Sequence, residues 1–265
     1  NVKGYKGEGT VVAVIDTGVD VYHEYMVVDV DTEVELTKES IATVIANYEL
    51  NASDLRTGLT SDDVYYNRKF PFCFDYADDD TDVAPRAGDS HGVQIAGVIA
   101  ANGTVAKATK DNLHTTLEFN GVAPEAQIIG MKVFPDKGGE ASTSAIIAAV
   151  EDATTIGADV INVSLGSPAG FTFLEGLDLK AYELEYSFAI ARNARIIVTA
   201  PAGNEGNAGA ESYLYQLSNG GYSYPSTSYT DSGTINSPAS KNHATAVARI
   251  NNSKKVLPYI QHADG

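Results

Sequence analysis

An unbroken apolar run, Val11-Val12-Ala13-Val14-Ile15, ends directly on a carboxylate, Asp16. A β-branched run without polar alternation is typical of a strand buried on both faces of a parallel sheet. Open α/β sheets place ligands and chemistry at the carboxyl ends of such strands. The run therefore predicts a central strand over residues 10–15 with Asp16 at its tip. Taken alone, Asp16 is equally consistent with a loop carboxylate that caps a helix.

Further short apolar runs follow along the chain, and helical patterns separate them. The runs are residues 126–134, 159–165, 195–200 and 243–250. The helical patterns cover residues 89–102, 142–158 and 177–194. The second pattern begins with capping hydroxyls and ends near Gly157. This alternation predicts one α/β domain with a doubly wound, mostly parallel sheet and helices on both faces.

Three stretches do not fit the alternation. Residues 27–88 are polar and acidic with weak periodicity, and we interpret them as an insertion. Residues 103–120 are expected to form a loop. Residues 205–238 are rich in Tyr, Ser, Gly and Asn and are interpreted as a long loop suited to contact with another chain or peptide.

Charge and cysteine content exclude several classes of function. The formal net charge is -17, which argues against a surface that binds nucleic acid. The acidic run at 75–82, "DYADDDTD", is interpreted as a solvated loop, with calcium binding as the alternative. The single cysteine, Cys73, excludes a disulfide framework and a cysteine metal cluster. No stretch reaches the roughly 18 consecutive apolar residues of a membrane span.

Two other polar residues are candidates for chemistry. His91, in "GDSHG", opens the helix predicted over 89–102. The positive end of a helix dipole disfavours imidazolium, and a neutral imidazole is the state that a general base requires. Asn204 lies in the glycine-flanked turn "APAGNEG", where its amide can donate into a cleft. A plain structural histidine and a plain Asn-Gly turn are the alternatives.

Taken together, the segments that hold these residues resemble the subtilisin-like serine peptidase family. The matching segments, in that family's order, are "VVAVIDTGVD", "DSHGVQIAGVIAANG", "GVAPEAQIIGMKVF", "GADVINVSLGS" and "APAGNEG". The resemblance spans nearly the whole chain and is closest to the cell-envelope proteinase and C5a peptidase branch. It implies a serine endopeptidase that is secreted or associated with the cell wall and acts on protein or peptide substrates.

The resemblance also implies a role for each matched residue. Asp16 would orient the imidazole of His91, the general base, and Asn204 would donate its amide to the oxyanion. The backbone of Ser164, Leu165 and Gly166 would pair with the substrate as an added strand. Ala202 and Gly203 would line the first specificity pocket. No metal ligand is carried over, because residues 103–120 do not resemble the calcium loop of secreted subtilisins; no cofactor is required, and calcium is possible at an unknown site.

The nucleophile of this family is not found in the sequence. The family carries its serine in a Gly-Thr-Ser turn that opens a helix, and the chain contains no Gly-Thr-Ser. We therefore interpret residues 1–265 as a partial catalytic domain, incomplete at its C-terminal end, whose partner is the remainder of the domain with the serine. Two alternatives stay open: a catalytically inactive pseudo-peptidase that serves as a binding or adhesion module, and a calcium-dependent acidic surface protein.

Overall fold

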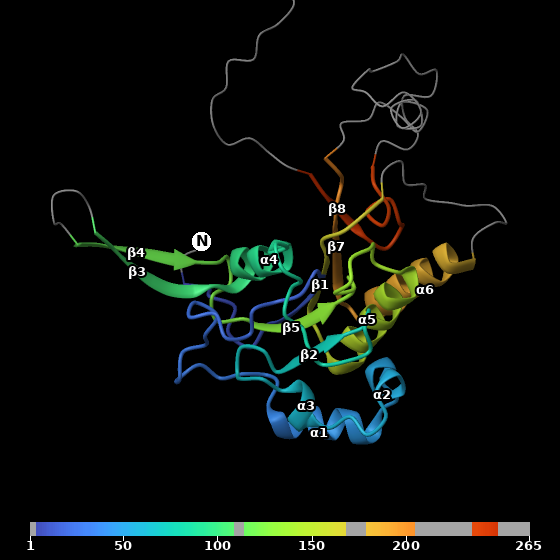
Figure 1. Cartoon of the computed structure of the whole chain (residues 1–265), viewed down its shortest axis with the longest axis horizontal. Coiled ribbons are helices and arrows are strands. Elements are labelled where there is room, and N and C mark those ends of the chain that lie inside the picture. The colour runs from blue at the N-terminus through green and yellow to red at the C-terminus, as the bar shows by residue number, and fades with distance from the viewer. Residues whose placement is uncertain (1–3, 109–113, 168–178, 205–234, 249–265) are drawn as a thin grey trace, which may run out of the picture.

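A six-stranded parallel sheet forms the centre of the molecule (Figure 1). The computed structural model describes residues 4–108, 114–167, 179–204 and 235–248. The strand order is β2-β5-β1-β6-β7-β8, and every neighbouring pair is parallel. The strands are β1 (Val11–Asp16), β2 (Phe72–Asp75), β5 (Gln127–Lys132), β6 (Val160–Val163), β7 (Ile197–Pro201) and β8 (Thr245–Val247). The predicted α/β fold class and all five predicted strands are confirmed.

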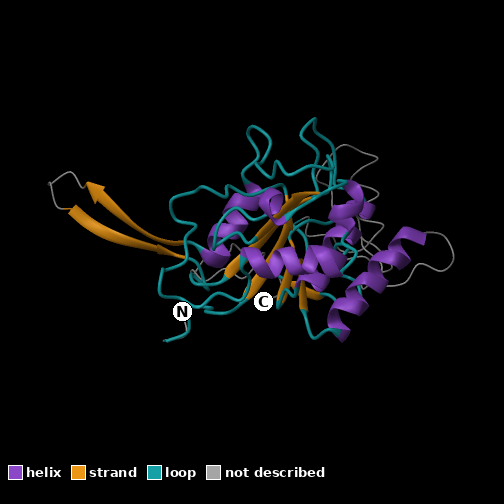
Figure 2. Cartoon of the chain, turned by 90° about the horizontal axis from the view of Figure 1, so that it is seen from below, coloured by secondary structure: helices purple, strands orange, loops and turns teal. Residues whose placement is uncertain are grey.

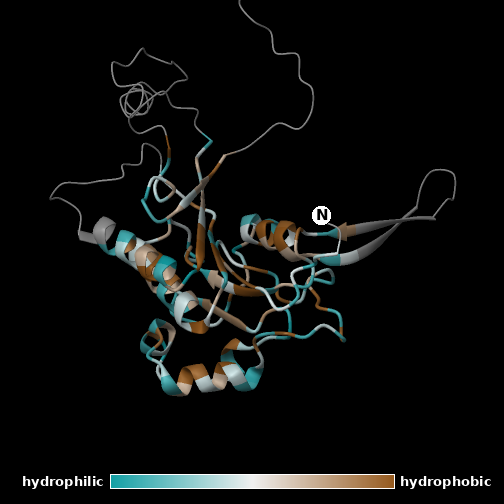
Figure 3. Ribbon diagram, turned by 180° about the vertical axis from the view of Figure 1, so that it is seen from behind, coloured by the Kyte–Doolittle hydropathy of each residue, from teal (hydrophilic) through white to brown (hydrophobic). Residues whose placement is uncertain are grey.

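Alternate residues of β1 enter two different hydrophobic cores, as expected for a strand covered on both faces. Val11, Ala13 and Ile15 lie in one core, with helices α5 (Thr143–Ile156) and α6 (Leu179–Asn193). Val12 and Val14 lie in the other, below α4 (His91–Ala100). Figure 3 shows hydrophobic residues concentrated along the central strands. The three helices predicted from periodicity are therefore confirmed on the two faces of the sheet.

The predicted limits of the α5 helix are confirmed in atomic detail. The Ser142 side chain accepts a hydrogen bond from the backbone N–H of Ala145 at 3.1 Å, as an N-cap does. At the other end Gly157 takes the left-handed conformation, with φ 99°. A residue without a Cβ adopts this conformation without strain, so the helix stops there.

The acidic stretch 27–88 contributes helices and a strand to the fold. It contains α1 (Lys38–Asn47), α2 (Asn51–Leu55), α3 (Ser61–Val64) and the sheet strand β2. Ile41, Leu50 and Val64 are fully buried in the same core as α5. Helices of four to ten residues give too few turns for a clear periodic signal, which is why the sequence pattern was weak here.

The expectation of a loop over 103–120 was wrong. Strands β3 (Asn102–Ala108) and β4 (His114–Asn120) form an antiparallel ribbon, in register from Asn102–Asn120 to Ala108–His114. Figures 1 and 2 both show this ribbon extending away from the sheet. Strand-forming residues in "HTTLEF" carried the signal, but the charged "KDN" between the strands was read as loop character for the whole stretch.

The long loop predicted over 205–238 lies mostly outside the described residues. Its last part is described and crosses back to the end of β6, where Ser167 and Ser237 form an isolated antiparallel bridge. Among the described helices, we find no stretch both long enough and apolar enough to cross a lipid bilayer.

Candidate active site

Asp16 is the last residue of β1 and is 1% exposed. The strand places its carboxylate at the carboxyl edge of the sheet, where the apolar run required it to be. Oδ1 accepts a hydrogen bond from the backbone N–H of Thr17 at 2.7 Å. Burial raises the pKa of the Asp16 carboxyl, and the hydrogen bonds from His91 and Thr17 oppose this shift. The carboxylate is therefore held by specific donors in a site that disfavours its charge.

His91 is the first residue of α4 and points its Nδ1 atom at this carboxylate. Nδ1 lies 2.8 Å from Oδ1 and 3.0 Å from Oδ2 of Asp16. A carboxylate accepts only, so Nδ1 carries the proton and Nε2 is the atom with a free lone pair. The imidazole is 52% exposed, whereas its partner is buried. This is the arrangement of a general base whose tautomer is fixed from behind by a carboxylate.

Thr17 and Gly18, which follow Asp16, contact Gly92, which follows His91, and these contacts hold the pair together. The backbone N–H of Gly92 donates to Oγ1 of Thr17 at 3.0 Å. A Cβ on Gly92 would lie 2.2 Å from the carbonyl oxygen of Gly18, closer than atoms pack. Helix α4 thus approaches the turn after β1 as closely as only glycine permits. Sequence analysis missed Thr17 and Gly92, although the glycine directly after His91 was a usable signal.

The remaining candidate residues follow the next two strands of the sheet. Ser164, Leu165 and Gly166 come directly after β6, and Ala202, Gly203 and Asn204 come directly after β7. Because β1, β6 and β7 are adjacent and parallel, these segments share the carboxyl edge with Asp16 (Figure 1). With strands about 4.8 Å apart, the ends of β1 and β7 are separated by about 10 Å. Asn204 is exposed, and Gly203 before it has φ 111°.

An acidic cluster next to this edge was the candidate for a metal. Ligand atoms of Asp75, Asp78 and Asp136 lie within 4.8 Å of one another. The buried Lys132 ammonium lies 2.5 Å from Asp75 and 2.6 Å from Asp136. Burial alone would lower the pKa of Lys132, but hydrogen bonds to Asp136 and Asp75 raise it above its usual value. A cation of the protein itself therefore already pairs with two of these three carboxylates.

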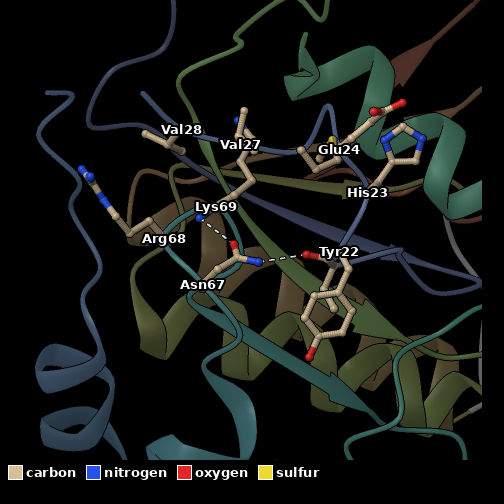
Figure 4. Close-up of a pocket in the computed structure, with 10 residues that line it drawn as sticks. Tyr22, His23, Glu24, Val27, Val28, Asn67, Arg68 and Lys69 are labelled. Atoms are coloured by element: carbon tan, nitrogen blue, oxygen red, sulfur yellow. Dashed lines mark hydrogen bonds between the residues drawn. The ribbon is translucent and has the colours of Figure 1, made fainter. Parts of the chain in front are cut away.

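A depression of about 390 Å³ lies away from the His91–Asp16 pair, between residues 21–28 and 67–69 (Figure 4). The side chains of Asn67 and Lys69, which line it, form hydrogen bonds within the protein. The Asn67 side chain donates to the carbonyl of Val21 at 2.8 Å and accepts from the backbone N–H of Lys69 at 2.9 Å. The Lys69 ammonium donates to the carbonyls of Pro124 and Ala126. These contacts account for the polar groups of Asn67 and Lys69, and we assign no ligand to the depression.

Comparison with known proteins gives a consistent result over nearly the whole chain. The sequence model described as "Subtilase family" matches residues 7–263. The PI-type proteinase of Lactococcus lactis subsp. cremoris is 34% identical over 264 residues, which cover 98% of this chain and 12% of that protein. The C5a peptidase of Streptococcus pyogenes is 27% identical over 254 residues, covering 96% of this chain and 19% of that protein. The chain thus spans about an eighth to a fifth of the length of these relatives.

Solved structures agree on the fold. The epidermin leader peptide processing serine protease (EpiP) of Staphylococcus aureus superposes with a TM-score of 0.52 at 20% identity. The match covers 91% of this chain and 46% of that one. At this identity the likeness supports the α/β fold and nothing finer.

Proposed function

Because the chain belongs to the subtilase family, we propose that it is the N-terminal portion of a serine endopeptidase catalytic domain. In this proposal Asp16 orients His91, and His91 takes a proton from a serine and returns it to the leaving amine. The serine attacks the peptide carbonyl, the C–N bond breaks, and water releases the acyl group. The observation that carries the proposal is the hydrogen bond from His91 Nδ1 to the buried Asp16 carboxylate at 2.8 Å.

The substrate and the oxyanion are assigned to the other two segments of the same edge. We propose that a protein or peptide substrate pairs with the backbone of Ser164–Gly166, and that Ala202 and Gly203 line its first specificity pocket. Asn204 donates its side-chain amide to the oxyanion. In subtilisin, a member of this family, loss of the oxyanion asparagine costs about 10²–10³-fold in turnover. We expect Asn204→Ala to lower kcat by a similar factor with little change in KM; an equal rise in KM would contradict an oxyanion role.

The nucleophile is proposed to come from a segment outside these 265 residues, since the sequence holds no Gly-Thr-Ser turn. The described part of the sheet supports this. Val12, Val160 and Ile197 are in register on the face that carries α4, and exposure rises along this row from 6% at Val12 to 56% at Ile197. Val247, on the same face of β8, is 53% exposed. An apolar sheet face is normally covered by a helix, and a helix that begins at the serine turn would cover this one.

The setting of the enzyme follows from the branch that the sequence resembles. We propose a secreted or cell-wall location, no nucleic-acid partner, and a reaction that needs no cofactor. The proposed acyl transfer uses only a serine, a histidine, a carboxylate and hydrogen-bond donors, so no step depends on a metal.

The experiment that tests the proposal is a reaction with a serine-directed fluorophosphonate, read by intact mass. We expect no adduct on the 265-residue chain and one adduct on the longer polypeptide that includes the Gly-Thr-Ser segment. In that longer protein His91→Ala should prevent the adduct, because the serine then lacks its base. An adduct on the 265-residue chain would show that the nucleophile is already present and would refute this assignment. A longer protein that gives no adduct would favour the pseudo-peptidase alternative.

A further inference from the structure

A second depression, of about 470 Å³, lies beside His91, and we call it the tyrosine pocket because Tyr22 and Tyr66 line it. Ser90, directly before His91, and Val93, in the first turn of α4, line it as well. The proposed reaction and the segments assigned to the substrate use none of these four residues. The pocket is therefore an unassigned space built against the helix turn that carries the proposed general base.

Backbone contacts fix the tyrosine pocket to the turn after Asp16. Val19 and Val83 both line the pocket and are buried. The N–H of Val19 donates to the carbonyl of Val83 at 2.8 Å. A Cβ on Gly18 would lie 2.6 Å from the same carbonyl oxygen and 3.0 Å from the nitrogen of Pro85, so the two segments approach closely. The pocket thus keeps a fixed place relative to the catalytic pair.

The two tyrosine rings give the pocket an aromatic wall. Tyr22 and Tyr66 meet edge to face, with ring centroids 6.2 Å apart and ring planes at 71°. The Tyr66 hydroxyl donates to the carbonyl of Thr81. Burial is the main cause that raises the pKa of Tyr66 to about 12, and the nearby charge of Asp82 adds to it. Tyr66 is therefore neutral and fixed, whereas Tyr22 is 80% exposed and offers its ring to a cation.

Two carboxylates complete the pocket. Asp20 and Asp82 line it, and both are exposed. Oδ1 of each accepts the backbone N–H two residues further along the chain, at 3.1 Å. Within the described ranges neither forms an ion pair. Arg86, the basic residue nearest to Asp82 in the sequence, pairs instead with Asp89 at 3.4 Å. The pocket therefore combines an apolar lining with two negative charges that have no cation of their own.

The order of the strands indicates which half of a substrate reaches the tyrosine pocket. The segments assigned to the residues before the scissile bond follow β6 and β7, whereas Val19–Tyr22 follow β1 and Asp82–Pro85 follow β2. In the sheet, β1 lies between the β2 side and the β6–β7 side. A peptide that pairs at the end of β6 and passes His91 therefore brings its leaving-group half toward this pocket.

We propose that the tyrosine pocket binds a lysine or arginine side chain of the protein substrate, at a position after the scissile bond. This inference rests on the proposed function. The aliphatic stem would pack on the valines and on the Tyr22 ring, and the charged head would reach Asp20 and Asp82. A neutral side chain of similar length gains only the stem contacts. An acidic side chain is repelled by the two carboxylates and by the net charge of -17.

The test uses the longer polypeptide that we propose to carry the serine. Its substrates are peptides with one Lys at successive positions on both sides of a fixed scissile bond, with Gln as the neutral reference. We expect Lys to raise kcat/KM by about 10-fold at a position after the bond, because exposed ion pairs and a cation–π contact each contribute about 2- to 5-fold. The gain should shrink as ionic strength rises, since the carboxylates are exposed.

Paired variants separate the pocket from the general charge of the protein. Asp20→Asn with Asp82→Asn keeps the oxygens that accept from the backbone and removes both charges. This pair should bring the Lys-to-Gln ratio within twofold of one and leave kcat/KM for the Gln peptide unchanged. Asp31→Asn with Glu33→Gln removes two exposed charges that do not line the pocket, and it should keep the parent ratio. Thermal unfolding of each variant checks that it is folded.

Each outcome separates this inference from the proposed function. If the parent cleaves peptides without a gain for Lys after the bond, the pocket assignment is wrong and the peptidase assignment stands. An equal loss of the gain in both paired variants would show that the overall charge, and not the pocket, attracts Lys. A gain that depends on Asp20 and Asp82 but lies before the bond would overturn the placement in the leaving-group half. If the parent cleaves no peptide, the proposed function fails and this inference fails with it.

Discussion

Replacing Gly92 by alanine tests whether close packing of α4 holds the catalytic pair, since it changes none of the side chains to which we assign a catalytic role. The added Cβ would lie 2.2 Å from the Gly18 carbonyl oxygen and 3.0 Å from Oδ1 of Asp16. Carbon and oxygen atoms that approach closely in proteins are about 3.3 Å apart. Helix α4 must therefore move about 1 Å away from the turn after β1, because the nearer neighbour is a backbone oxygen and the Asp16 carboxylate is held by hydrogen bonds from Thr17 and His91.

That displacement acts directly on the pair. His91 precedes Gly92 in the first turn of α4, and its Nδ1 is 2.8 Å from Asp16. Moving α4 by about 1 Å stretches this distance to about 3.8 Å, beyond a hydrogen bond. Misplacement of a catalytic group by about 1 Å costs on the order of 10²-fold in turnover. Overpacking of this kind also costs about 1–3 kcal/mol of stability, which for a domain of this size lowers Tm by about 2–12 °C.

The same helix supplies a matched control. A Cβ on Gly97 would meet nothing within 4 Å, so Gly97→Ala adds the same methyl group without a clash. Alanine is favoured over glycine inside a helix by about 1 kcal/mol, and we expect Tm to rise by about 2–4 °C with unchanged kcat. Both variants are to be made in the longer polypeptide that we propose to carry the serine, with Tm from thermal unfolding and kcat from peptide hydrolysis.

Two results would refute this reasoning. If Gly92→Ala melts no lower than the parent, α4 does not approach the β1 turn as closely as described. If it melts lower but keeps kcat within twofold, the close approach stabilises the fold without positioning His91. A loss of activity in Gly97→Ala as large as that in Gly92→Ala would show that α4 tolerates no added methyl group, and the comparison would lose its meaning.

Two further predictions concern buried carboxylates. Burial raises the pKa of Asp16, so this group favours folding below its unfolded pKa near 4 and loses that contribution as pH rises through its folded pKa. Asp16→Asn should therefore be at least as stable as the parent in thermal unfolding at pH 7. Its kcat should fall by about 10⁴, the loss seen for the same change in a chymotrypsin-type triad. Lys132→Met leaves the buried Asp75 without its cation and should cost about 3–5 kcal/mol in denaturant unfolding at pH 7, with a smaller loss at pH 3 where carboxylates are protonated. A stable Lys132→Met protein at pH 7, or a destabilised Asp16→Asn protein, would contradict these assignments.

Sequence reasoning succeeded where a residue's environment is local. The run that ends on Asp16 predicted a strand buried on both faces, and a strand tip in an open α/β sheet faces the ligand side. The start of α5 after Ser142 and its end at Gly157 were readable because caps and left-handed glycines act within a few residues. The hydrogen bond between His91 and Asp16 itself spans 75 residues and is a product of the fold.

Sequence reasoning failed where strand pairing depends on residues far along the chain. Strand β2 is four residues long and is defined by its register with β5, more than fifty residues away. The β3–β4 ribbon is defined by pairing between residues 102–108 and 114–120, and the charged sequence between them looks the same as that of a loop.

The acidic run at 75–82 shows how such long-range pairing changes a functional interpretation. In the sequence, "DYADDDTD" suggests either a solvated loop or a calcium site. In the fold, β2 pairs with β5 so that Asp75 is in register with Lys132, and the ammonium of Lys132 enters the carboxylate cluster. A cluster that already holds a cation gains little from calcium, because the metal would have to displace a buried ammonium with two ionic partners. We therefore expect calcium to raise the Tm of Lys132→Met, whose carboxylates lack a cation, more than that of the parent; an equal rise in both would place any calcium site elsewhere.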